Sequence, residues 1–206
     1  MKRSALPASL LALAFALAGC APGAQPGSSP DSPAGGSGMH TGHGSAPSSA
    51  PTAGDHSAAD TMFAQMMIPH HQQAVEMSDA VLAKDGMDPR IIGLATGIKA
   101  AQGPEIEKMT GWLKAWGEPV APGTAHHSME GMMSGEDMAK LREAEGDAAA
   151  ALFLTQMIAH HQGAVKMAEK EASEGSNPEA VDLARKIVED QKAEIKTMED
   201  MLPDYR

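Results

Sequence analysis

Two pairs of adjacent histidines, each flanked by methionines, are the residues of this sequence best suited to chemistry. One pair lies in FAQMMIPHHQQAVEM (63–77) and the other in FLTQMIAHHQGAVKM (153–167). Neutral imidazole and thioether donors, with no thiolate nearby, suit copper, Cu(I) most of all and Cu(II) as a second option. The predicted metal ligands are Met67, His70, His71, Met77, Met157, His160, His161 and Met167.

The spacing of these donors fits a helix. Met67 and His71 are four residues apart, one helical turn, so both side chains can reach one ion. His70 and Met77 are seven residues apart, two turns along the same face. The second segment repeats both spacings, so the sequence predicts two similar donor sets. It does not decide whether the two sets share one ion.

The elements that carry these donors are duplicated. Residues 63–77 match 153–167 at an offset of 90, and a second stretch after Pro89 matches the stretch after Pro178 at an offset of 89. Each repeat therefore reads as helix, turn and helix, over residues 60–116 and 135–202. No segment alternates with a period of two. We predict an all-α fold, a four-helix bundle made of two duplicated helical hairpins.

Capping residues support the predicted helix ends. Asp60 is the expected N-cap of the first helix, and Asp88 and Asn177 precede the prolines that begin two others. Between the hairpins, Ser134 begins a capping box for a short extra helix over residues 135–145, which Gly146 is expected to end.

Polar residues also fall on the apolar stripe of the second helix in each hairpin. Burying a polar group costs free energy unless it is paired, so these residues need partners. They can accept the second ring N–H of a ligating histidine and fix its tautomer, the carboxylates more strongly than the amides. A buried structural network without metal remains the alternative. The predicted supporting residues are Gln102, Glu105, Gln191 and Glu194.

Two segments outside the helices carry further His and Met donors. One lies in a Gly/Ser/Pro-rich stretch, and the other is the linker 117–134 between the hairpins. Such short His-rich tracts are typical of auxiliary metal binding. The auxiliary candidates are Met39, His40, His43, His126, His127, Met129, Met132 and Met133.

The N-terminus is typical of an exported lipoprotein. Lys2 and Arg3 precede a short apolar run, and small residues lead to Cys20, the only cysteine. We predict a signal peptide over 1–19, lipidation of Cys20, and a disordered tether over 20–58 before a folded domain over 59–206. The protein would then be membrane-anchored through lipid and face the periplasm or the cell exterior.

Composition excludes several classes of function. The net charge is −11 and aromatic residues make up 3% of the chain, so nucleic-acid binding is not expected. No nucleophile triad or phosphate-binding loop is present, and we predict no catalytic residues and no enzyme activity. A ferritin-like di-iron oxidase is the enzymatic alternative, but its Glu-x-x-His motifs are missing.

The paired HHxxAVxM motif, followed in each repeat by QxxEIxxM, resembles a bacterial family of unknown function that includes CopM-type copper-binding proteins. The resemblance covers about residues 60–202. It implies a ferritin-like bundle, export, and in some members copper binding and tolerance. Pro69/Ala159, Gln73/Gly163 and Glu76/Lys166 differ between the repeats, so the two halves need not bind equally.

Together these features predict an exported, lipid-anchored protein that buffers or sequesters copper through His/Met sites. A non-metal structural or interaction bundle, with a buried His/Gln/Glu network, is the other alternative. Nothing in the sequence identifies a partner protein that delivers copper.

Overall fold

A computed structural model describes residues 55–120 and 129–205, and these residues contain helices and no strand. The helices are α1 (Ala58–Leu82), α2 (Pro89–Trp116), α3 (Gly135–Glu143), α4 (Gly146–Glu174) and α5 (Pro178–Met201), followed by a 3-10 turn, η1 (Leu202–Tyr205). The all-α prediction is therefore confirmed. None of the described helices is both long enough and apolar enough to span a bilayer.

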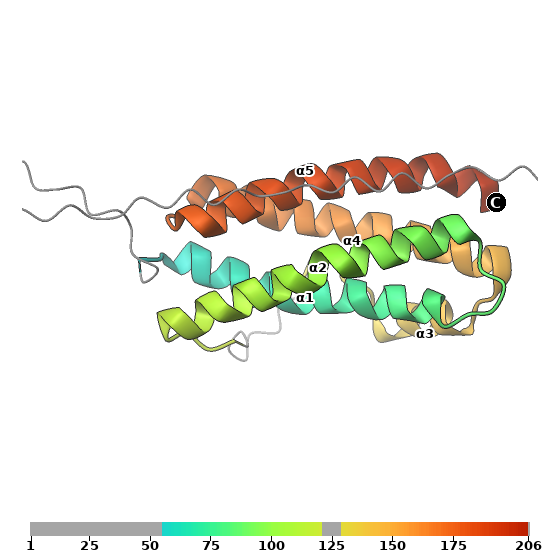
Figure 1. Ribbon diagram of the computed structural model, residues 1–206, viewed down its shortest axis with the longest axis horizontal. Helices are drawn as coiled ribbons and strands as arrows, with labels where there is room; N and C mark the ends of the chain where they lie inside the picture. Colours follow the sequence, from blue (N-terminus) through green and yellow to red (C-terminus); the bar gives the residue numbers. More distant parts are fainter. Residues whose placement is uncertain (1–54, 121–128, 206) are drawn as a thin grey trace, which may run out of the picture. The chain divides into compact units, whose positions relative to one another are not determined.

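Two antiparallel hairpins make up the fold. α1 packs along α2, α4 packs along α5, and the hairpins meet through α1 and α4 (Figure 1). α1 and α4 run in opposite directions, because the start of α1 shares a core cluster with the later part of α4. The two repeats are thus related by an approximate twofold axis through the α1–α4 contact.

Helix ends follow from local sequence, with three corrections. Ser57, not Asp60, is the N-cap of α1; Asp60 is the third residue of the helix and completes a capping box. α1 therefore begins at Ala58. α3 begins after Ser134 as predicted, but it ends at Glu143. Gly146 is instead the first residue of α4. It has a positive φ of 53° and lies at the junction between α3 and α4.

Asp60 has a long-range role that its sequence position does not reveal. Its carboxylate accepts hydrogen bonds from the Ser57 backbone and hydroxyl, from both donors of Ser176, and from the Asn177 N–H. These bonds tie the start of α1 to the turn between α4 and α5. They hold the pKa of Asp60 well below its usual range, against the opposing effect of burial.

The apolar core forms two clusters along the bundle. One contains Phe63, Met67 and Met109, and the other contains Met77, Phe153 and Met157. On α1 and α4, the histidine pairs fall between the residues of the two clusters. A polar layer, formed by the histidine pairs, therefore separates the two apolar clusters at the middle of the interface between the hairpins.

Candidate metal centre

The four core histidines are almost completely buried. His70, His71 and His161 have no exposed surface and His160 is 1% exposed. The rings of His70 and His160 face each other across the α1–α4 contact, with centroids 3.8 Å apart and planes inclined by 43°. The two repeats thus contribute to one shared layer, which the sequence left open.

Each of the other two histidines is held by a carboxylate from its own hairpin. His71 Nε2 lies 2.9 Å from Glu105 Oε2, and His161 Nε2 lies 2.7 Å from Glu194 Oε2. A carboxylate only accepts, so Nε2 carries the hydrogen in both rings. When the hydrogen is on Nε2, the Nδ1 atom of a neutral imidazole keeps its lone pair. Glu105 and Glu194 thus accept the hydrogen bonds from histidine that we expected of them. Their contribution to metal binding stays a prediction.

Unpaired nitrogen atoms fill this layer. Nδ1 of His70, His71 and His161 and both ring nitrogens of His160 are buried with no hydrogen-bond partner. Leaving a buried polar atom unpaired costs about 1–3 kcal/mol. A core selected for stability alone would place Leu or Ile here, so the unpaired lone pairs fit a bound metal ion.

The ring nitrogens are available as lone-pair donors at neutral pH. Burial, followed by repulsion from the neighbouring His71, lowers the pKa of His70 to about 3. Burial, followed by repulsion from His70, likewise holds the pKa of His160 well below its usual range. Both rings are therefore neutral at pH 7, as metal ligands must be.

The predicted thioethers lie on both sides of the histidine layer. Met67 belongs to one core cluster, with Met167 packed at its edge, and Met77 and Met157 belong to the other. The early methionine of each repeat therefore shares a cluster with the late methionine of the other repeat. Met167 is the exception in burial: it is partly exposed, while the other three are fully buried.

Oxygen and amide donors add little to this centre. No group of three or more His, Cys, Asp and Glu side chains in residues 55–120 and 129–205 is arranged to hold a metal ion. Both amide atoms of Gln102 and Oε1 of Gln191 are buried without partners, so these atoms do not orient a histidine. An ion in this layer would therefore be bound by a small number of imidazole nitrogens together with thioether sulfur atoms.

The interhelical linker covers the histidine layer, a feature that the sequence analysis missed. The Glu130 carbonyl lies 3.4 Å from His70 Nε2, and the Gln73 amide exchanges two hydrogen bonds with the Met133 backbone, of 2.7 and 2.9 Å. We call residues 129–134 the strap. Lys166 forms an ion pair with Glu130. The strap thus spans from α1 to α4.

Gly163 makes this crossing possible. A Cβ atom built at Gly163 would lie 2.0 Å from the Glu130 carbonyl oxygen. A Cβ atom built at Gly131, which has a φ of 84°, would lie 2.7 Å from the Ala159 carbonyl oxygen. The differences between the repeats at Gln73/Gly163 and Glu76/Lys166 were the sequence signal for these contacts. The residues at these positions contact the strap or α3, and neither of these segments is duplicated.

The auxiliary candidates are only partly described. Met129, Met132 and Met133 lie in the strap and are partly buried. The remaining candidates and the lipidation site lie outside the described residues: Cys20, Met39, His40, His43, His126 and His127.

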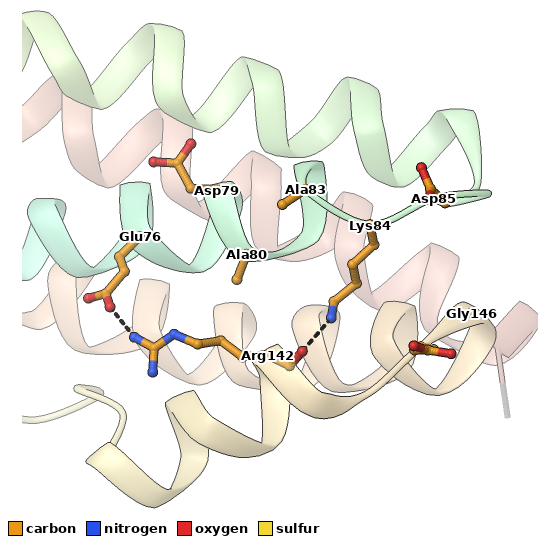
Figure 2. A pocket seen from close by; sticks show the side chains of 9 residues that line it. Glu76, Asp79, Ala80, Ala83, Lys84, Asp85, Arg142 and Gly146 are labelled. Carbon is orange, nitrogen blue, oxygen red and sulfur yellow. Dashed lines mark hydrogen bonds and ion pairs between the residues drawn. The ribbon is translucent and has the colours of Figure 1, made fainter.

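A surface cavity lined mainly by charged residues lies elsewhere. It has a volume of about 860 Å³ and lies beside the end of α1 and α3 (Figure 2). There Arg142 pairs with Glu76, and Lys84 donates to the Arg142 carbonyl. These contacts hold α3 against α1, and none of them involves a core histidine.

The duplicated helical region matches a known protein family. A family model described as domain of unknown function DUF305 matches residues 60–202. The chain belongs to the DUF305 family. The resemblance inferred from the paired motif is thereby confirmed. No curated protein matches the chain.

Three solved structures of similar proteins share the fold. A Streptomyces coelicolor protein inferred to be secreted is 35% identical, with a TM-score of 0.67 over 71% of this chain and 92% of that chain. A Deinococcus radiodurans DUF305 fragment is 33% identical, with a TM-score of 0.66 over 72% and 97%. CopM in its Cu(I)-bound form is 34% identical, with a TM-score of 0.61 over 71% and 96%. CopM has also been solved with Cu(II) and with Ag.

Proposed function

We propose that this protein is an exported, non-enzymatic copper-binding protein that buffers or sequesters copper. The observation that carries the proposal is the buried His70–His160 contact, where unpaired imidazole nitrogens from both repeats meet between two methionine-containing clusters. The relation to CopM, which binds Cu(I) and Cu(II), supports the identity of the metal.

The donor set favours Cu(I) over Cu(II). Cu(II) prefers four nitrogen or oxygen ligands in a tetragonal arrangement, whereas Cu(I) accepts fewer ligands and favours thioethers. The described residues hold no cluster of three or more His, Cys, Asp and Glu for one ion, and the histidine layer is buried. The proposed ligands are the histidines of the layer with Met67, Met77, Met157 and Met167.

Export and lipid anchoring complete the proposal. The N-terminal pattern ending at Cys20 supports a lipid anchor, and the secreted assignment of the Streptomyces coelicolor relative supports export. Thioethers and imidazoles remain useful ligands in an oxidising compartment, where thiols would be oxidised.

A competitive Cu(I) titration of the full chain against a chromophoric chelator tests the central site. His70→Asn together with His160→Asn should abolish the tightest binding, while circular dichroism shows that the helices remain. His56→Asn is the matched control, because His56 stacks on Trp116, with ring centroids 4.5 Å apart, outside the layer.

Two results would contradict the proposal. One is wild-type affinity no tighter than micromolar, about −8 kcal/mol. The other is equal affinity in the double variant and the wild type. Either would leave the histidine layer as a structural network.

A further inference from the structure

A second cavity, about 310 Å³ in volume, lies between the start of α1 and the end of α4. Three methionines line it: Met62 and Met66 from α1, and Met167 from α4. Phe63 supplies an apolar wall. The cavity of Figure 2 has no methionine in its lining, so this concentration of sulfur distinguishes the second cavity.

Helix geometry directs the donors to the same groove. Met62 and Met66 are four residues apart on α1, so their side chains project from one face. Met167 and Glu171 have the same spacing on α4, which packs antiparallel to α1. Met62 is 51% exposed, which makes its thioether accessible from solvent.

A buried acid, Glu171, is part of the lining. It is 2% exposed. Burial, followed by its contact with Asp60, raises the pKa of Glu171 to about 8, so its carboxyl group is mostly protonated at pH 7. The charged residues on the rim, Lys170 and Glu174, pair with each other at 4.0 Å.

The other repeat lacks this arrangement. At the offset of 90, the positions of Met62, Met66, Met167 and Glu171 are occupied by Leu152, Gln156, Met77 and Val81. Sulfur is kept at the position of Met167, as Met77, so the features found at one end alone are the sulfur atoms of Met62 and Met66 and the carboxyl group of Glu171. The cavity is therefore a local feature of the α1–α4 end that contains Asp60.

We propose that Met62, Met66 and Met167 form a second binding site for a soft monovalent metal ion, Cu(I), outside the histidine layer. Neutral thioethers select such ions over harder divalent ones, and Ag(I) shares this preference. The choice of ion rests on the proposed copper function. Met62 and Met66 belong to this site alone, whereas Met167 is also a proposed ligand of the histidine layer.

The site also has a position suited to capture. Met66 is followed by Met67, which is fully buried in the core cluster beside the histidine layer. Exposure falls from Met62 through the partly buried Met66 to Met67. The cavity is thus an outer site, more accessible to solvent than the histidine layer.

The test uses the full chain labelled with methyl-13C methionine and titrated with Ag(I), which does not change oxidation state. The variant combines Met62→Leu with Met66→Gln, the residues that the other repeat carries at these positions. We expect it to bind one Ag(I) equivalent fewer than the wild type. In the wild type, the methyl signals of Met62, Met66 and Met167 should shift on binding. Met138→Leu, a buried methionine of α3, is the control and should leave the stoichiometry unchanged.

The two proposals fail in different ways. If the histidine layer binds no metal, His70→Asn with His160→Asn leaves the stoichiometry unchanged, but the cavity variant still loses one equivalent. If the cavity variant binds as many Ag(I) ions as the wild type, or the three methyl signals do not move, the second site is wrong.

Discussion

At the scale of single residues, burial rather than residue type gives the histidines their character. The same imidazole that would titrate near neutrality in water stays neutral in this layer, because burial disfavours its charged form. The close approach of His70 and His160 reinforces this effect, since both rings cannot hold a proton without strong repulsion. Neutral imidazole rings can bind a metal ion. Because the folded state resists their protonation, they also make the fold less stable in acid.

We therefore predict that stability falls as the pH decreases below about 6.5. The unfolded chain binds protons at His70 and His160 below that pH, while the folded chain resists protonation until about pH 3 at His70 and lower at His160. Each such histidine lowers the free energy of unfolding by up to about 1.4 kcal/mol per pH unit in that window. Urea unfolding between pH 4 and pH 7 measures the effect.

The variant His70→Asn/His160→Asn provides the comparison for the acid sensitivity. Its stability should depend less steeply on pH in the same window, because two of the groups that titrate on unfolding are gone. Equal slopes in the variant and the wild type would show that these histidines are not held neutral by the fold.

At the scale of elements, the strap is the part of the chain that distinguishes the two repeats. It crosses α4 at Gly163 and forms hydrogen bonds to α1 through Gln73, so it covers the histidine layer from one side. The symmetric positions of the repeats build the layer, and the asymmetric positions bind the strap.

Gly163→Ala should displace the strap. Its Cβ atom would meet the Glu130 carbonyl at 2.0 Å, and backbone must move to relieve the overlap. We expect a loss of about 1–3 kcal/mol, typical of overpacking, and faster hydrogen exchange at the Met133 amide, which Gln73 now protects. Hydrogen-exchange mass spectrometry and urea unfolding measure both.

Gly93→Ala is the matched control for the strap. Gly93 also lies within a helix, but nothing is within 4 Å of the position its Cβ would take. Alanine there should be neutral or stabilising by up to about 1 kcal/mol. Unchanged exchange at Met133 in Gly163→Ala would mean that the strap is not held by this contact.

At the scale of the whole described molecule, the histidine layer joins the two hairpins. His70 and His71 come from the first hairpin, and His160 and His161 come from the second. An ion bound between His70 and His160 would connect the hairpins directly. Metal binding and cohesion of the bundle should therefore be coupled.

Cu(I) should raise the melting temperature of the full chain in a single transition. A free ion concentration one hundred times Kd adds about 2.7 kcal/mol, which corresponds to roughly 5–10 °C for a domain of this size. Scanning calorimetry under anaerobic conditions measures the shift. The variant His70→Asn/His160→Asn should show a smaller shift, whereas a wild-type melting temperature unaffected by copper would favour the non-metal structural alternative.

Local sequence patterns are enough to predict the helices, their duplication and the candidate donors. Apolar residues with helical spacing, prolines at two helix starts and the repeated His-His pairs are all local signals, so they can be read without coordinates. The same signals predicted that Glu105 and Glu194 would meet histidines, because each pair lies within one hairpin. The family resemblance followed from the same residues.

Contacts between distant segments of the chain could not be predicted from local patterns. The meeting of His70 with His160 requires the two hairpins to pack antiparallel, and no local pattern specifies that register. Asp60 shows the same limit: its carboxylate bonds Ser57 nearby, but it also binds Ser176 and Asn177 across the bundle. The strap and the methionine cavity likewise arise where helix faces are brought together, because long-range packing, not spacing along the chain, sets those distances.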